Sequence, residues 1–360
     1  MSDDMRDLLQ EAAQRIFADR PSDLWGVLQS AGFDKALLPE SEGGAGVRWS
    51  DAFGLLASAG EHAAAVPLAE AMIGHWLADR AGVGSPGLPT VAMSSSSEPV
   101  RLEPAGERWL VSGSLPRVPW GRACTHVAFV VGEGPTARLI IIDRSAPGVS
   151  VTPGHNLAGE ARDHVVLEGV EPVAMGPAPL DAGALLVIGA IARSAMMAGA
   201  IEHILALAVD YANLRVQFGR QIGKFQAIQQ NIAVLATLAA AARAAADAGS
   251  EAIDDWLAGH SESLTHSIEA LSAKIRTGEA AGQASAIVHQ VFGAIGFTEE
   301  HELHNFTKRL WSWRDECGNE AFWSLALGEH ILDCGTDETL WRSIAPAQNG
   351  IDTIATGAAR

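Results

Sequence analysis

The spacing of apolar residues predicts helices in the first part of the chain. Between Asp4 and Gly82, apolar side chains recur at intervals that place them on one stripe of a helix, as do Leu8, Leu9, Ala12 and Ile16. Residues 21–23, Pro-Ser-Asp, form a start signal for a second helix. A glycine-rich loop follows at residues 37–51, and Ser50 or Asp51 near its end is expected to cap the next helix.

The pattern then changes to strands and back to helices. From about Pro89 to Pro177, short runs rich in β-branched residues alternate with Gly, Pro and Ser, which predicts a small antiparallel sheet domain. From about Leu180 to His330 the helical period returns in three or four long segments dense in Ala, Leu and Ile. These helices are apolar on more than one side, as expected if they pack both in a bundle and against a neighbouring subunit.

The pattern therefore predicts an α+β fold with three parts. We expect an N-terminal helical domain at residues 1–85, a middle β domain at 86–178, a C-terminal four-helix-bundle domain at 179–348 and a tail at 349–360.

Charge and composition narrow the classes of partner. The 360 residues include 25 basic and 43 acidic ones, and the net charge of −18 argues against binding to nucleic acid or to an anionic membrane face. The longest apolar run, Ala182–Ala192, stops at Arg193, short of the roughly 20 residues of a membrane span. The acidic N-terminus does not resemble a secretory signal, so we predict a cytoplasmic protein. His301 and His304 lack a third ligand in a recognisable frame, so no metal site is predicted.

The most specific segment is residues 214–226, which reads LRVQFGRQIGKFQ. An arginine at a helix–helix junction can pair with a pyrophosphate, and polar and aromatic neighbours can hold the rest of a dinucleotide. Taken alone, the segment could also be an ordinary interhelix turn with a surface arginine. It closely resembles the R-x-x-F-G-x-x…Q segment of the acyl-CoA dehydrogenase family, whose flavoenzymes have helical, β and helical domains in this order.

That resemblance implies FAD as cofactor and assigns roles by position. In the family this segment contacts the adenosine and pyrophosphate half of an FAD bound to the adjacent subunit. Carried over, Arg215 would meet the pyrophosphate, Gln217 its oxygens, Phe218 the flavin or adenine edge, and Gln226 the adenine.

Two further segments carry the same resemblance. Residues 290–298 resemble the family's Q-x-x-G-G-x-G-[FY] turn, so that Gln290 and Gly293 would approach the adenosine part of the cofactor, although Ala294 replaces the usual second glycine. Residues 37–46, LLPESEGGAG, resemble the family's P-E-x-x-G-G-x-G loop. The resemblance covers most of the chain, from about residue 25 to 345.

The segments that clasp the flavin ring in the family depart from its pattern. Residues 92–98 read AMSSSSE where the family has T-E-P-x-x-G-S-D, and residues 115–120 read LPRVPW where it has a W-I-T-N strand. Pro116 and Pro119 cannot donate backbone hydrogen bonds to a ligand. We therefore expect a chain that keeps the half-site serving a neighbour's FAD and has lost much of its own.

The catalytic base is the second departure. The reaction removes an α-proton from an acyl thioester while hydride leaves the β-carbon, so a carboxylate is required. One branch of the family places its Glu where this chain has Gly189-Ala190, and an ungapped count puts the Glu of the other branch on Cys317. A shift of one residue would make Glu316 the base, in surroundings that could raise a carboxyl pKa. The alternative is an ion-paired turn of Arg314, Asp315 and Glu316.

Three hypotheses follow. The first is a subunit of a heterotetrameric acyl-CoA dehydrogenase that lends its FAD adenosine half-site to a related chain, acts on bulky acyl-CoA substrates such as sterol side-chain thioesters, and passes electrons to an electron-transferring flavoprotein. The second is a self-sufficient homo-oligomeric dehydrogenase with Glu316 as base. The third is a flavin-free scaffold subunit without catalytic activity.

Overall fold

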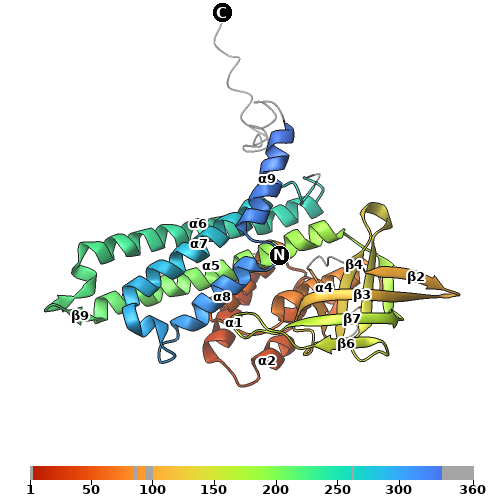
Figure 1. Ribbon diagram of the computed structural model, residues 1–360, viewed down its shortest axis with the longest axis horizontal. Helices are drawn as coiled ribbons and strands as arrows, with labels where there is room; N and C mark the ends of the chain where they lie inside the picture. Colours follow the sequence, from red (N-terminus) through yellow and green to blue (C-terminus); the bar gives the residue numbers. More distant parts are fainter. Residues whose placement is uncertain (1–2, 85–86, 94–99, 262, 335–360) are drawn as a thin grey trace, which may run out of the picture.

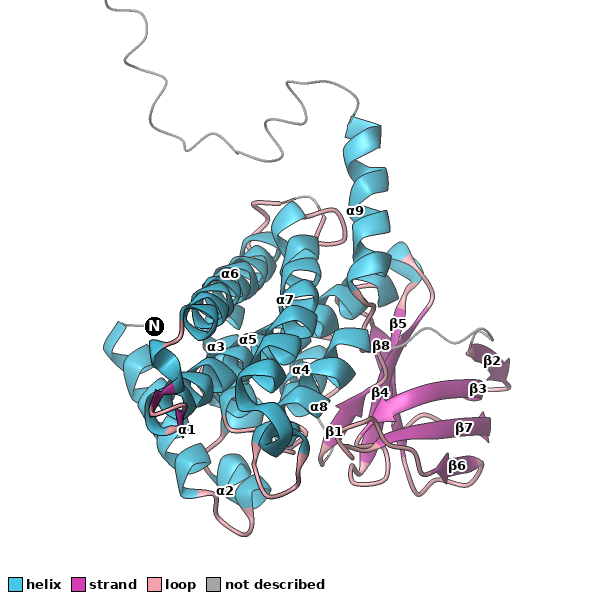
Figure 2. Ribbon diagram, turned by 60° about the vertical axis from the view of Figure 1, so that its left-hand side comes forward, coloured by secondary structure: helices cyan, strands magenta, loops and turns pink. Residues whose placement is uncertain are grey.

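The chain folds into helices, then strands, then helices again (Figures 1 and 2). The computed structural model describes residues 3–84, 87–93, 100–261 and 263–334. The first group contains α1 (Asp3–Asp19), α2 (Leu24–Ser30), α3 (Trp49–Glu61) and α4 (Leu68–Arg80), with 3-10 turns η1 (Phe33–Lys35) and η2 (Glu40–Glu42) before α3. The helical pattern predicted for this region is confirmed.

The N-terminus of α3 is capped from another part of the chain. The Trp49 and Ser50 amides donate to the two carboxylate oxygens of Asp254, at 2.8 and 3.0 Å, and Asp254 lies on a helix some 200 residues later. The expectation that Ser50 or Asp51 caps this helix is therefore wrong, because α3 already begins at Trp49 and a distant carboxylate takes the cap position. The same contact ties the N-terminal helices to the C-terminal bundle.

The strands form two sheets that share one core. One sheet has the order β1-β4-β5-β8 and the other β2-β3-β7-β6. All pairings in these two sheets are antiparallel except that of β1 with β4, which is parallel. Apolar residues of both sheets, such as Val118, Phe129, Ile140 and Val165, pack in one cluster. The strands are β1 (Pro89–Val91), β2 (Arg101–Ala105), β3 (Arg108–Pro119), β4 (His126–Val131), β5 (Arg138–Asp143), β6 (Val149–Thr152), β7 (Arg162–Val170) and β8 (Ala174–Pro177), and the 3-10 turn η3 (Gly134–Thr136) follows β4.

The second helical group surrounds one long apolar helix. It contains α5 (Ala182–Leu214), α6 (Gln226–Leu257), α7 (Ile268–Phe292), α8 (Leu303–Asp315) and α9 (Glu320–Cys334). Helices α6, α7 and α8 all contact α5, and α9 projects from the body of the protein (Figures 1 and 2). The α+β fold class is confirmed. The domain boundaries at 85, 178 and 348 stay predictions; the first and the last of them, and the tail, lie outside the described residues.

Two of the described helices, α5 and α6, are long and apolar enough to cross a membrane by length and composition alone. The most apolar window of α5 is 94% buried inside the fold, so its hydropathy reflects core packing. The corresponding window of α6 is 28% buried, and its outer face is rich in alanine.

Helices α3 and α5 approach so closely that only glycine fits at two positions. A Cβ on Gly199 would lie 1.9 Å from the carbonyl oxygen of Ala57, and one on Gly60 would lie 2.0 Å from that of Met196. Because both obstacles are backbone atoms, the helices would have to separate to accept a methyl group.

We expect Gly199→Ala to destabilise the chain by about 1–3 kcal/mol, because it overpacks this crossing. Urea unfolding at neutral pH measures the effect. Gly328→Ala on α9 is the matched control, since a Cβ there meets nothing within 4 Å and the substitution should be neutral or slightly stabilising. Equal stability of Gly199→Ala and the wild type would show that the crossing can relax.

Candidate functional site

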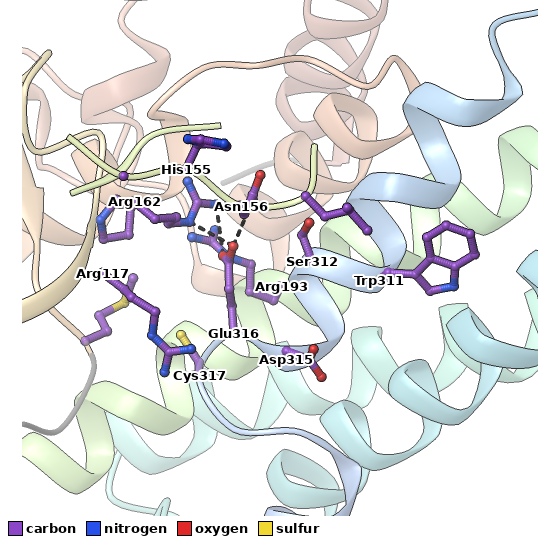
Figure 3. A pocket seen from close by; sticks show the side chains of 14 residues that line it. Arg117, His155, Asn156, Arg162, Arg193, Trp311, Ser312, Asp315, Glu316 and Cys317 are labelled. Atoms are coloured by element: carbon purple, nitrogen blue, oxygen red, sulfur yellow. Dashed lines mark hydrogen bonds and ion pairs between the residues drawn. The ribbon is translucent and has the colours of Figure 1, made fainter. Parts of the chain in front are cut away.

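A cavity of about 410 Å³ lies where the β domain meets the C-terminal helices (Figure 3). Its walls come from the segment after β1, from β3, from the loop between β6 and β7, from α5, and from α8 with the turn that follows it. They include Met93, Arg117, Asn156, Trp311, Glu316 and Cys317. Residues at the positions of the family's flavin clasp, such as Arg117 and Pro119, therefore line one cavity with Glu316, the predicted base. This cavity is the chain's own candidate reaction cleft.

Glu316 has its hydrogen-bonding capacity filled by neighbouring side chains. Its Oε1 accepts from Arg162 Nε at 2.8 Å and from Asn156 Nδ2 at 3.0 Å. Its Oε2 accepts from Arg193 Nε at 2.7 Å and from Arg162 Nη2 at 2.9 Å. A carboxylate offers about four lone-pair positions, so none remains for a substrate proton.

The bonding of Glu316 belongs to a larger buried network. Arg193 Nη2 also donates to Glu70 Oε1 on α4, at 2.5 Å. Arg162 Nη2 donates to Glu160 Oε2 at 3.0 Å, and Glu160 Oε1 accepts from Arg309 on α8, also at 3.0 Å. Three carboxylates and three guanidinium groups thus balance in charge, and we call Glu70, Glu160, Arg162, Arg193, Arg309 and Glu316 the ion-pair network.

The network also fixes the protonation state of Glu316. Burial by itself would raise the pKa of this carboxyl, but the charges of Arg162 and Arg193 and the hydrogen bonds from Arg162 and Asn156 lower it to about 2. A carboxylate so stabilised is a weak base at neutral pH. The geometry therefore does not favour Glu316 as the base, and that assignment stays a prediction for mutagenesis.

A buried lysine fixes the backbone of the turn around Cys317. Lys274 Nζ, on α7, donates to the carbonyl oxygens of Arg314, Glu316 and Gly318 at 2.7, 2.7 and 2.6 Å. Cys317 has a positive φ of 55°, and burial raises the pKa of its thiol. The turn thus presents a neutral thiol where the sequence count places the family's glutamate.

Strand β3 does not fit a flavin ring in this cleft. The pairing of β3 with β7 shifts between Leu115 and Val118, and Arg117 inside that bulge has a φ of 51°. Pro116 and Pro119 present no N–H, and the Pro119 carbonyl accepts from Thr90 Oγ1 at 2.5 Å. Of the first clasp segment, residues 94–98 lie outside the described residues.

The predicted half-site for a neighbour's cofactor lies at the far end of the bundle. Between α5 and α6, β9 (Val216–Gln217) and β10 (Arg220–Gln221) form a hairpin, followed by the 3-10 turn η4 (Ile222–Lys224). The turn residues Phe218 and Gly219 both have positive φ, 50° and 78°, as a two-residue type I′ turn requires. Phe218 is 93% exposed, an unusual state for an aromatic residue in a strained conformation.

The other predicted cofactor residues are brought to the same end. Gln290 and Gly293 stand at the junction of α7 with the 3-10 turn η5 (Gly293–Phe297), where Phe292 stacks on Tyr211 of α5 with ring centroids 4.3 Å apart. Arg215, Gln217, Gln226, Gln290 and Gly293 are all exposed. Within the described part of the chain no carboxylate pairs with Arg215, so its charge is available to an anion.

The two ends of the site are far apart. Arg193, bonded to Glu316, and Arg215 lie on or next to α5 and are 22 residues apart, which corresponds to about 33 Å at the rise of an α-helix. A dinucleotide is shorter than that separation. The sequence therefore predicted residues that the fold places in two separate regions, Glu316 in the cleft and the other six at the hairpin end.

Sequence reasoning did not identify the partners of Glu316. Nothing in the spacing of the sequence assigns a role to Glu70, Arg162, Arg193 or Lys274. One signal was present, because Arg193 interrupts a long apolar stretch and a charge in a buried helix requires a partner. The partner itself could not be read from the sequence.

Comparisons with known proteins agree with this architecture. A profile of the acyl-CoA dehydrogenase C-terminal domain matches residues 182–348. The acyl-CoA dehydrogenase IpdE2 of Mycobacterium tuberculosis is 38% identical over 143 residues, which is 39% of each chain. The first curated relatives are matched over 39% to 57% of their own length.

Two solved structures share the fold over nearly the whole chain. The Tcur3481–Tcur3483 steroid ACAD has a TM-score of 0.80 at 23% identity, and the ChsE4–ChsE5 complex from Mycobacterium tuberculosis has 0.81 at 20%. In both cases the match covers 92% of this chain and 98% of the other. Residues 182–348 thus match the C-terminal domain of the acyl-CoA dehydrogenases in sequence, and the whole chain has the fold of these solved structures.

Proposed function

We propose that this chain is a subunit of an acyl-CoA dehydrogenase and that its hairpin end binds the adenosine and pyrophosphate half of an FAD held by a related partner chain. FAD is the cofactor of the family, and when bound it supplies the hydride acceptor for α,β-dehydrogenation of an acyl-CoA thioester. An electron-transferring flavoprotein would reoxidise it.

The observation that carries this proposal is the separation of the two regions. The exposed Arg215, Gln217 and Phe218 suit an anionic dinucleotide, yet they lie about 33 Å along α5 from the chain's own cleft. A dinucleotide at the hairpin would therefore not reach this cleft, and its flavin end would be held by another molecule. In that arrangement Arg215 would neutralise a pyrophosphate, and Gln226 and Gln290 would donate to or accept from the adenosine part.

The residues of this chain's own cleft favour a related chain over a second copy as the partner. A second copy of this chain would bring the same ion-paired Glu316 and the same proline-interrupted β3. A related chain with an intact flavin clasp and a free carboxylate would complete the reaction. Two of the solved structures with this fold carry the names of two chains each, Tcur3481–Tcur3483 and ChsE4–ChsE5, which supports a heteromer. The word steroid in one of these names is consistent with a bulky acyl group.

The visible spectrum of the purified protein tests the proposal. We expect no flavin bands from the chain purified alone and flavin bands after co-expression with a related chain that has an intact clasp. Flavin bands from the lone chain would favour a self-sufficient homo-oligomer, and their absence from both preparations would favour a flavin-free scaffold.

A further inference from the structure

The ion-pair network joins all three parts of the fold at one place. Glu70 comes from α4 of the N-terminal helices, Glu160 and Arg162 come from the β domain, and Arg193 and Glu316 come from the C-terminal helices. Glu70 and Arg193 are each 1% exposed, and Glu160 is 4% exposed. Charges so deeply buried require partners, and each of these groups has one.

The network occupies the inner wall of the cleft. Arg162, Arg193 and Glu316 line the cavity, and Figure 3 shows both guanidinium groups converging on the Glu316 carboxylate. Cys317 and Arg117 lie beside them in the same view. The three charged groups of this wall, Arg162, Arg193 and Glu316, are therefore already bonded to one another.

Removing the central carboxylate would leave two cations facing each other. Arg162 and Arg193, which are 7% and 1% exposed, would lose a shared counter-charge, while Glu70 and Glu160 could each compensate only one of them. Glu160 is further committed to Arg309 and to the Trp313 indole, whose Nε1 donates at 3.0 Å. Glu316 is thus the only carboxylate that bridges the β domain and α5 directly in the described network.

We infer that Glu316 is the hub of an interdomain lock: the ion-pair network takes the place of a ligand in the chain's own cleft, excludes flavin and acyl chain from it, and holds the three domains together without a cofactor. This inference builds on the proposed function, since a subunit that lends its hairpin to a partner needs a stable cleft of its own. It concerns a different region of the molecule and can fail independently.

Glu316→Gln in the full chain is the first test. It removes the charge and keeps the shape, and we expect a melting temperature lower by roughly 5 to 10 °C. Glu171→Gln, which breaks the exposed pair with Arg108, is the matched control and should leave the melting temperature within about 2 °C. A Glu316→Gln protein as stable as the wild type would overturn the lock.

A second variant covers the case in which Glu316→Gln does not fold. Arg162→Lys keeps the positive charge but loses the fork that reaches both oxygens of Glu316. We expect a smaller drop in melting temperature than for Glu316→Gln, of a few degrees. An unchanged melting temperature would contradict the inference.

Acid titration separates the lock from a catalytic role. The folded-state pKa of Glu316 lies below its ordinary value, so its contribution to stability is present above about pH 4.5 and is lost as pH falls towards 2. The wild type should therefore lose more stability between pH 5 and 3 than Glu316→Gln does. Loss of turnover in the co-expressed pair without any change in melting temperature or acid profile would make Glu316 a base instead.

Flavin binding by the lone chain tests the closed cleft. Any FAD that binds to the lone chain should bind at the hairpin, so Arg215→Ala should abolish that binding and any rise in melting temperature that comes with it. Saturable binding that survives Arg215→Ala would place flavin in the cleft and overturn the inference. The proposed function fails on another measurement, the flavin content of the co-expressed pair, so the two outcomes are distinguishable.

Discussion

Arg215→Ala is expected to weaken FAD retention by the heteromer about 10- to 100-fold. The reason is that a guanidinium without a carboxylate partner in the described chain would lose its charge-assisted hydrogen bonds to the pyrophosphate, worth about 1.5–3 kcal/mol. The hairpin itself should persist, because its strands pair through the backbone of Val216–Gln217 with Arg220–Gln221. Equilibrium dialysis of the co-expressed pair against free FAD measures the change.

Arg276→Ala is the control for this experiment. Arg276 lies on α7 in an exposed pair with Glu279, so the substitution removes the same charge away from the hairpin. Its FAD affinity should match that of the wild type apart from a small salt-dependent term. Full FAD retention by Arg215→Ala would contradict the role proposed for the hairpin.

Arg193→Met should destabilise the chain by about 3–5 kcal/mol. Arg193 is 1% exposed and pairs with both Glu70 and Glu316. Its removal therefore leaves two buried carboxylates that have each lost a positively charged partner. Burial lowers the pKa of the arginine, but the charges of Glu70 and Glu316 raise it well above its ordinary value, so it is charged at every pH of interest. Urea unfolding at pH 7 gives the free energy directly.

Two further variants serve as controls for that result. Arg243→Met removes the half-exposed pair with Glu202 and should cost no more than about 1 kcal/mol. The triple variant Arg193→Met, Glu70→Leu, Glu316→Leu replaces charges with apolar groups and should recover much of the lost stability. If Arg193→Met were no less stable than Arg243→Met, the buried pairs would contribute little to stability.

The architecture could be predicted from the sequence because its signals are periodic and repeated. In the first helix, Leu9, Ala12 and Ile16 of the predicted stripe pack against the core, although Leu8 is 60% exposed. The short runs after Pro89 form strands, and the apolar helix after Asp181 is buried along most of its length. The hairpin residues were found for a different reason. Their order along residues 214–226 resembles a family segment, and a local turn preserves that order in space.

The bonding around Glu316 could not be predicted in the same way. Its four hydrogen bonds come from residues 123 to 160 positions away, on α5 and on the loop and strand near Arg162. Hydrophobic spacing carries no information on which buried charge meets which. The same limit explains the cap of α3, where Asp254 acts across 204 and 205 residues. Long-range polar contacts are fixed only when the domains dock.

The most direct test of the account is the ratio of FAD to protein in the co-expressed heteromer, from the visible absorbance of the denatured pair and its amino-acid content. A shared site at the hairpin together with a closed cleft predicts about one FAD for each pair of unlike chains. About two FAD molecules per pair would show that this chain's cleft also holds flavin, and would contradict the account.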